Sequence, residues 1–291
     1  MKTRIIVSAV LLPIFFCVLF IFPAYILTII MSAICAIAAY ELLCATKTNN
    51  NKRVLVYTIT AATLIPMAVY LSMLPASTPN PLSTLILTTL LLSIFFILIC
   101  LLLIEIALTF KSTKKPEKKI NLRHILISLA AGMLIPYLLS SLVSLKTMPY
   151  GHLLVLLPIV SAFMTDSGAY FIGVAIGKRK AFPTISPNKT VEGCIGGIIT
   201  GTLGMVIFGA IIANTTQLNV IIPAITIYGI LGAIVTELGD LAFSFIKRKC
   251  EIKDYGRLIP GHGGILDRFD SMTLTAPTMY LLVTIIPAIF V

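Results

Sequence analysis

The sequence predicts an all-α fold, a polytopic bundle of about nine transmembrane helices with its N-terminus in the cytoplasm. Its 291 residues are 58% hydrophobic and only 11% charged, with a mean hydropathy of +1.04. Soluble domains carry about 25% charged residues. The net charge of +11 would suit nucleic-acid binding, but the basic residues lie in short gaps between apolar runs rather than on a polar face. We therefore expect an integral membrane protein with membrane lipid around it and no nucleic-acid partner.

Cutting the chain at its polar gaps gives nine candidate spans of roughly the length that crosses a bilayer. They cover residues 5–22, 24–45, 54–75, 83–110, 124–146, 152–177, 191–213, 220–243 and 271–290. The first boundary is a turn at Pro23, because an unbroken helix over 5–45 would be too long for a bilayer. The first five spans form an N-terminal region, 1–150, and the remainder a C-terminal catalytic region, 151–291.

The distribution of basic residues fixes the orientation of these spans. With nine spans and the N-terminus inside, all of the 22 Lys and Arg residues except Lys146 fall on one face. The positive-inside rule identifies that face as cytoplasmic. The opposite connections are short and nearly uncharged, and the six cysteines show no CxxC spacing. We expect a bacterial inner membrane protein, with a homodimer preferred over a monomer.

The densest polar stretch runs from Glu237 into the predicted cytoplasmic loop 244–270. Glu237, Asp240, Ser244 and Lys247 are spaced so that they share one stripe of a helix. Carboxylates inside a membrane span are costly, so they face a cavity, a metal ion or a charged partner. An ion pair of Glu237 or Asp240 with Lys247 is the simpler interpretation of this stripe.

A second group of acids, Asp267 and Asp270, stands directly before the ninth span. Carboxylates brought together from two helix ends, Asp240 and Asp267, repel each other unless a cation lies between them. Oxygen ligands favour Mg²⁺ over zinc. We predict Asp240 and Asp267 as metal ligands and Asp270 as a further ligand, with one or two metal ions and an additional monovalent cation left open. Gly263 and Gly264 allow positive φ, so that their N–H groups can bind an anion, with a merely flexible loop as the alternative.

The other polar region leads from Asp166 into the predicted cytoplasmic loop 178–190. Asp166 lies roughly 18 Å from that loop at helical rise, a depth that is hard to justify for a structural acid. Ser186, Lys189 and Thr190 stand before a helix start. Thr190 suits a capping role, and the free N–H groups of the same helix end suit anion binding. Glu41 and Glu105, near helix ends, are expected to be paired or interfacial rather than catalytic.

The run 244–270 resembles the signature of the phosphatidate cytidylyltransferase family, S-x-x-K-R-x4-K-D-x4-[LIF]-[PG]-x-H-G-G-x-x-D-R-x-D. Every fixed position is filled, by Ser244, Lys247, Arg248, Lys253, Asp254, Pro260, His262, Gly263, Gly264, Asp267, Arg268 and Asp270. The segment 186–193 and Asp166 with Ala169 and Tyr170 are similar to the family as well. Asn188 departs from it, because the family often has lysine there. The first 150 residues resemble it in size, in hydropathy and at Glu41.

The resemblance implies a cytosol-facing, metal-dependent enzyme that transfers a cytidylyl group from CTP to phosphatidic acid. Asp240 and Asp267 would then hold the metal. The resemblance further implies that three basic residues are catalytic or contact phosphate: Lys247, Arg248 and Arg268. It also implies a set of substrate-binding residues: Ser244, Lys253, His262, Gly263, Gly264, Asp166, Ser186 and Lys189. Two alternatives stay open: a CTP-dependent transferase or kinase acting on another membrane lipid, and a transporter, since buried acids also mark ion pathways. The long, Gly-rich loop of mixed charge argues against transport.

Overall fold

A computed structural model describes residues 17–49, 51–74, 81–111, 121–258 and 263–290. Within this part, the structure is mainly helical, and seven helical segments are long and apolar enough to cross a membrane. The chain divides into two compact units, one made of Met1–Gly151 with Ile252–Asp267 and the other of His152–Glu251 with Arg268–Val291. The predicted all-α class is confirmed, whereas the count of nine spans is not.

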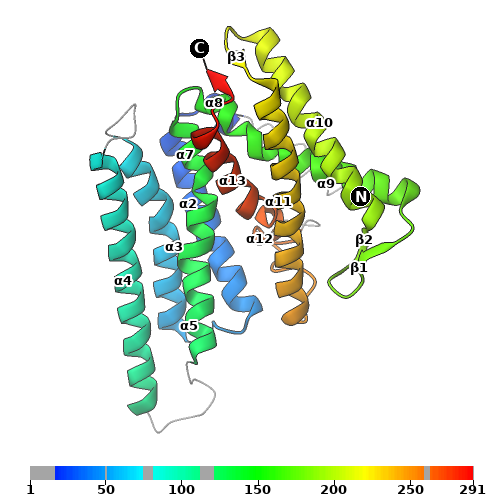
Figure 1. Ribbon diagram of the computed structural model, residues 1–291. Helices are drawn as coiled ribbons and strands as arrows, with labels where there is room; N and C mark the ends of the chain where they lie inside the picture. Colours follow the sequence, from blue (N-terminus) through cyan, green and yellow to red (C-terminus); the bar gives the residue numbers. More distant parts are fainter. Residues whose placement is uncertain (1–16, 50, 75–80, 112–120, 259–262, 291) are drawn as a thin grey trace. The chain divides into compact units, whose positions relative to one another are not determined.

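The first unit is a set of long helices that follow the predicted spans. These are α2 (Ala24–Ala45), α3 (Lys52–Met73), α4 (Pro81–Lys111) and a broken span of α5 (Leu122–Leu129), η2 (Ala130–Leu134), α6 (Ile135–Leu139) and α7 (Ser141–Thr147). Helix α3 packs against both α2 and α4 (Figure 1). The broken span contains a π-helical turn directly before the segment with Pro136, whose ring removes a helical hydrogen bond.

The predicted turn at Pro23 is confirmed. Residues 17–20 are helical, the N–H groups of Ile21 and Phe22 both donate to Cys17 O, and α2 then begins at Ala24. Most of the first predicted span, 5–22, lies outside the described residues.

The second unit is built around three long helices. Its elements are α8 (Gly151–Leu154, at the boundary), α9 (Leu156–Ile176), β1 (Lys180–Phe182), β2 (Ser186–Thr190), α10 (Val191–Thr215), β3 (Asn219–Val220), α11 (Ile222–Lys249), α12 (Leu266–Phe269, across the boundary), α13 (Met272–Ile285) and β4 (Ile289–Phe290). Helix α10 packs against α9 and α11. A Cβ at Gly168 would lie 1.7 Å from Thr200 Oγ1, so α9 and α10 approach each other through a glycine.

The surfaces of the spans are apolar where helices have no protein neighbour. Phe96 is 69% exposed, Phe163 70% and Val174 73%. Soluble proteins rarely expose so many large apolar side chains, whereas helices in lipid do so routinely. This exposure agrees with the composition in indicating a membrane protein.

Three boundaries differ from the sequence predictions. Helix α11 continues to Lys249, so Ser244, Lys247 and Arg248 lie on a helix and the predicted loop 244–270 begins only after it. The predicted loop 178–190 contains an antiparallel β-hairpin of β1 and β2, with Lys180 opposite Thr190 and Phe182 opposite Ser186. The last predicted span, 271–290, is the 14-residue helix α13, followed by β4, which pairs with β3.

Candidate active site

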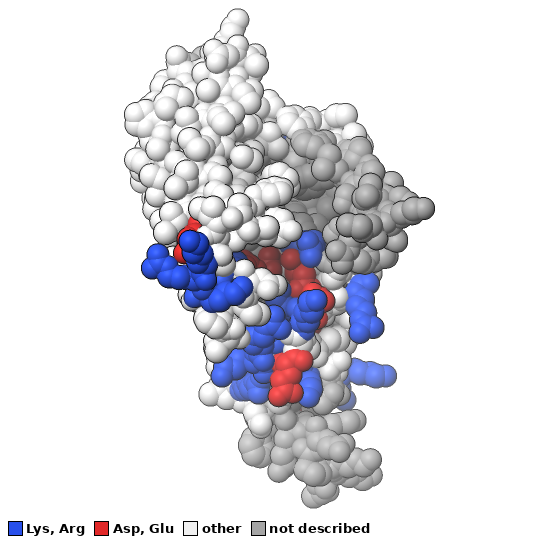
Figure 2. All heavy atoms as spheres, turned by 90° about the vertical axis from the view of Figure 1, so that its right-hand side faces the viewer, with Lys and Arg blue, Asp and Glu red and all other residues white. Residues whose placement is uncertain are grey.

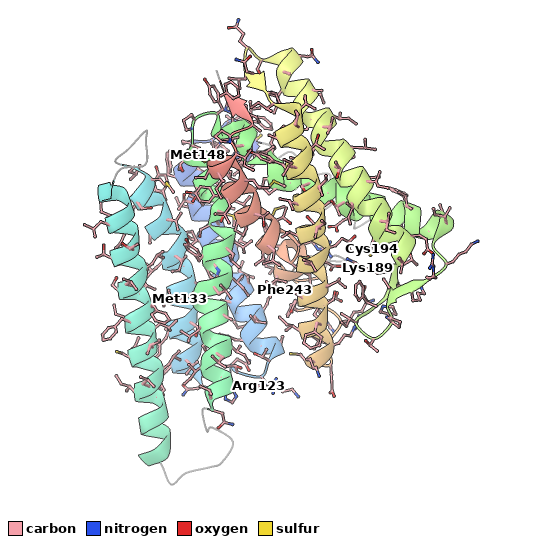
Figure 3. The ribbon with its side chains drawn as sticks, in the orientation of Figure 1. Arg123, Met133, Met148, Lys189, Cys194 and Phe243 are labelled. Carbon is pink, nitrogen blue, oxygen red and sulfur yellow. The ribbon has the colours of Figure 1, made fainter. Side chains whose placement is uncertain are left out.

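The charged centre of the second unit is Lys189, at the end of β2. Its Nζ lies 2.7 Å from Asp240 Oδ2 and also forms an ion pair with Glu237, one turn earlier on α11. The side chain of Lys189 is 17% exposed, and Glu237 is buried. Figure 3 labels Lys189 on the hairpin side of α11, close to Cys194 of α10. The Cys194 thiol lies 3.8 Å from Glu237 Oε2.

The electrostatics of this centre keep Lys189 charged. Burial alone would lower the pKa of Lys189, but the charges of Asp240 and Glu237 and its hydrogen bonds to both raise the pKa above its usual value. Lys189 is therefore a permanent cation at physiological pH. One ammonium group faces two carboxylates, so the centre keeps a net negative charge.

Local chain geometry explains how Lys189 reaches α11. Thr190 is the N-cap of α10, and its Oγ1 accepts a hydrogen bond from Gly193 N at 3.1 Å, which confirms the predicted capping role. The β1–β2 pairing holds the preceding residues extended. Arg248, on α11, donates from Nε to Ile185 O at 3.1 Å and so ties the hairpin turn to the same helix. Ser186 follows that tied residue and is half-buried.

Asp166 belongs to the same charged neighbourhood. It lies on α9, is exposed, and interacts electrostatically with Asp240, Lys189, Glu237 and Asp270. The structure thus brings the predicted Asp166, Lys189 and Asp240 together. The sequence places Glu237 on the same helical stripe as Asp240 but predicts Lys247 as its ion-pair partner; its pairing with Lys189, 48 residues earlier in the chain, leaves no local signal.

The signature residues at the end of the second unit form a further set of contacts. Lys247 Nζ lies 3.6 Å from Asp270 Oδ2, and Asp270 Oδ1 accepts a hydrogen bond from Ser271 N at 2.8 Å. Ser244 Oγ lies 3.5 Å from Asp240 Oδ1. Glu237 and Asp240 are thus paired with Lys189, which lies outside the α11 stripe, and Lys247 pairs with Asp270.

The segment of the first unit that precedes α12 is organised by Asp267. Its Oδ2 accepts hydrogen bonds from Tyr255 N at 2.8 Å and Gly264 N at 3.0 Å, and the residue is buried. Gly263 has φ +87, so the predicted positive φ in this loop is confirmed there. Asp267 thereby links the two ends of the loop.

Two glutamates of the first unit have different kinds of partner. Glu105 is paired as predicted, with Arg53 Nη1 at 3.3 Å and Asn51 Nδ2 at 3.1 Å. Glu41 is buried and accepts hydrogen bonds from Ile265 N and Leu266 N, directly beside the signature loop. Sequence reasoning missed this contact because no local pattern connects residues so far apart.

The remaining predicted residues are exposed or undescribed. Lys253 and Arg268 are exposed, whereas His262 lies outside the described residues. In the view of Figure 2, Lys and Arg side chains gather in one region together with Asp and Glu side chains, next to a larger area that carries neither.

The carboxylates also suit a hard cation. Glu237 Oε1 is buried and has no hydrogen-bond partner among the residues that the structure describes. Such an oxygen, beside Asp240, has the chemistry that Mg²⁺ prefers. Within the described part of the chain, no cluster of three or more His, Cys, Asp or Glu side chains is arranged to hold a metal. Asp240 and Asp267 belong to different units, so their joint binding of a metal stays a prediction.

Comparison with known proteins identifies the family. The sequence model described as the cytidylyltransferase family matches residues 2–286. The chain belongs to the cytidylyltransferase family. The family match also includes the N-terminal half of the chain, whose resemblance to the family in sequence is limited to size, hydropathy and Glu41.

Individual relatives carry a more specific name. The chain is 43% identical over 140 residues to a phosphatidate cytidylyltransferase of Bacillus subtilis, covering 47% of this chain and 49% of the relative. It is 44% identical over 130 residues to one of Haemophilus influenzae, covering 44% and 45%, and 42% identical over 131 residues to one of Staphylococcus saprophyticus, covering 44% and 48%. These matches span about half the length of each relative.

Proposed function

We propose that the protein is a phosphatidate cytidylyltransferase, which transfers CMP from CTP to phosphatidic acid and forms CDP-diacylglycerol and pyrophosphate. The observation that carries the proposal is the charged centre at Lys189, with Asp240 and Glu237, in a chain of the cytidylyltransferase family. The relatives named phosphatidate cytidylyltransferase indicate the lipid acceptor. The active site is proposed to face the cytoplasm of a bacterial inner membrane, and the protein to act as a homodimer.

The proposed reaction is an in-line displacement at phosphorus. A phosphate oxygen of phosphatidic acid forms a bond to the α-phosphorus of CTP, and the bond from that phosphorus to the bridging oxygen of the β-phosphate breaks, so pyrophosphate leaves with the electron pair. The nucleophile is already an anion, and the reaction therefore needs no general base. The protein must instead orient two polyanions and offset their mutual repulsion.

The basic residues of the signature are assigned to that task. Lys247 and Arg248 on α11, with Lys253 and Arg268, would contact the triphosphate or the lipid phosphate. Arg248 uses Nε to hold Ile185 O, so a phosphate contact would come from the other nitrogens of its guanidinium group. Ser244 would donate a hydrogen bond to a phosphate oxygen.

Acidic residues are assigned to the metal. Asp240 and Asp267, with Asp270 as a further ligand, would hold Mg²⁺, which when bound supplies positive charge to the phosphates. The proposed site holds one or two Mg²⁺ ions, and the proposal also includes a monovalent cation that assists the reaction. Lys189 forms ion pairs with Asp240 and Glu237 and so holds both side chains in place, and Asp166 would line the polar cavity that admits the lipid headgroup.

The test uses purified protein in detergent with CTP labelled in its cytidine, phosphatidic acid and Mg²⁺. Wild-type protein should place the label in the lipid extract, and Asp267→Asn should lower the rate by about 100-fold or more, as expected for loss of a metal ligand. Glu251→Gln, an exposed acid in the same part of the chain that the signature does not fix, is the matched control and should keep the wild-type rate. Full activity of Asp267→Asn would contradict the assigned role.

A further inference from the structure

Glu41, on the last turns of α2, contacts the signature loop although it lies outside the signature. Its Oε1 accepts a hydrogen bond from Ile265 N at 3.1 Å and its Oε2 one from Leu266 N at 2.8 Å. The residue is 5% exposed. Leu266 is the first residue of α12, where N–H groups have no partner within the helix. A buried carboxylate from another helix therefore satisfies the amides at this helix start through charge-assisted hydrogen bonds.

The fit around the Glu41 carboxylate is close. A Cβ at Gly256 would lie 2.2 Å from Glu41 Oε1, and a Cβ at Gly264 would lie 2.5 Å from Glu41 Oε2. The loop backbone thus approaches the carboxylate from two sides at positions where any larger residue would displace it. Gly264 belongs to the signature, whereas Gly256 does not, and a side chain at either position would have to displace the Glu41 carboxylate.

The same loop backbone also holds Asp267. Three consecutive amides are divided between two carboxylates: Gly264 N donates to Asp267 Oδ2, and the next two N–H groups donate to Glu41. A displacement of the chain at Ile265 and Leu266 would therefore move Gly264 and, with it, the carboxylate of Asp267. All these contacts lie within one compact unit.

From these contacts we propose that Glu41 is a positioning residue for Asp267, a role that rests on the proposed function of Asp267 in cytidylyl transfer. Glu41, from α2, holds the backbone of the signature loop through Ile265 and Leu266. The loop in turn orients the Asp267 carboxylate through Gly264 N, so Glu41 acts on Asp267 through the loop backbone. Residues that orient metal ligands in this way change metal affinity or activity by about 10–100-fold when they are replaced.

The test compares Glu41→Gln, Glu41→Asp and Glu105→Gln. Glutamine keeps the size of the side chain but turns an –NH₂ group toward one of the two donating amides. Aspartate keeps both acceptors and withdraws them by one methylene. Glu105 is the matched control, because it is equally buried in the same unit and accepts two hydrogen bonds, but from Asn51 and Arg53.

Hydrogen exchange in the metal-free protein is the first readout. In Glu41→Gln the amides of residues 264–266 should exchange faster than in wild type, and in Glu105→Gln they should not. The second readout is kinetic: Glu41→Gln should lower kcat by about 10–100-fold and raise the Mg²⁺ concentration needed for half activation, Glu41→Asp should be intermediate, and Glu105→Gln should keep both values.

Wild-type exchange and an unchanged Mg²⁺ requirement in Glu41→Gln would overturn the inference, as would equal effects in Glu105→Gln. Should Glu41→Gln fail to fold, Glu41→Asp carries the same comparison, and wild-type values for it would overturn the inference. A wild-type protein that forms no labelled lipid would refute the proposed function alone, because the exchange experiment still decides whether Glu41 holds the loop.

Discussion

Replacing Lys189 by methionine removes a cation that forms ion pairs with both Glu237 and Asp240. The substitution keeps the length and apolar stem of the side chain, so its effect comes from the lost charge. Glu237 is buried at 6% exposure, and one of its oxygens already has no hydrogen-bond partner among the described residues. Lys189→Met therefore leaves two neighbouring carboxylates without their shared partner.

The expected magnitude follows from the burial of the three side chains. Removing one member of a fully buried ion pair costs about 3–5 kcal/mol. The side chains of Lys189 and Asp240 retain 17% and 26% exposure, which allows water to screen part of the charge, so we expect a loss of about 2–3 kcal/mol. The second unit has 124 residues, a size between those for which 1 kcal/mol shifts Tm by about 4–8 °C and by about 2–4 °C, so the loss corresponds to a fall in Tm of about 4–24 °C.

The assay is thermal unfolding of the purified protein in detergent. Lys180→Met, an exposed lysine of β1 in the same hairpin, is the control and should shift Tm by little. Adding Glu237→Gln to Lys189→Met removes one uncompensated charge and should recover part of the loss. Because the pKa of Lys189 lies above its usual value, the ion pair persists at every pH below about 10, and the difference in stability should be the same at pH 7 and pH 9. Equal Tm values for Lys189→Met and Lys180→Met would refute this account of the centre.

Three other predictions concern the hairpin, the helix packing and the metal. Arg248→Ala removes the donor to Ile185 O and should make the hairpin turn more sensitive to limited proteolysis, whereas Lys249→Ala should leave it as in wild type. Gly168→Ala places a Cβ against Thr200 and should destabilise the protein by about 1–3 kcal/mol in thermal unfolding, with only partial recovery in the double variant carrying Thr200→Ala, because the Cβ of residue 200 would still lie 2.6 Å from the new Cβ. Removal of divalent cations with a chelator should abolish label transfer from CTP, and added Mg²⁺ should restore it, while activity that survives chelation would exclude the assigned metal.

The helical spans of the fold were predictable because the bilayer imposes a length and a composition on them. Hydropathy located α2, α3, α4, α9 and α10 within a few residues of their observed bounds. Hydropathy marks where the membrane ends rather than where a helix ends, which is why the polar last turns of α11 were assigned to a loop. The hairpin was missed because Ser186, Pro187 and Asn188 have little intrinsic preference for strands.

The charged residues of the candidate site were predictable in type but not in partner. Asp240, Asp267 and Lys189 carry the pattern of a phosphate-binding, metal-dependent site in the sequence, and the structure places Lys189 on Asp240. The contact of Glu41 with Leu266 joins residues 225 positions apart, and only tertiary structure can bring them together. Long-range capping of this kind leaves no periodic or local signal.

The most direct test of cytidylyl transfer is one reaction with CTP that carries one label in the cytidine and another in the γ-phosphate, supplied with phosphatidic acid and Mg²⁺. The account predicts that the cytidine label enters the lipid extract while the γ-label leaves as pyrophosphate, in equal amounts. A γ-label in the lipid with CDP in solution would show a kinase and contradict the proposed function, and the absence of both labels from phosphatidic acid would contradict the lipid assignment.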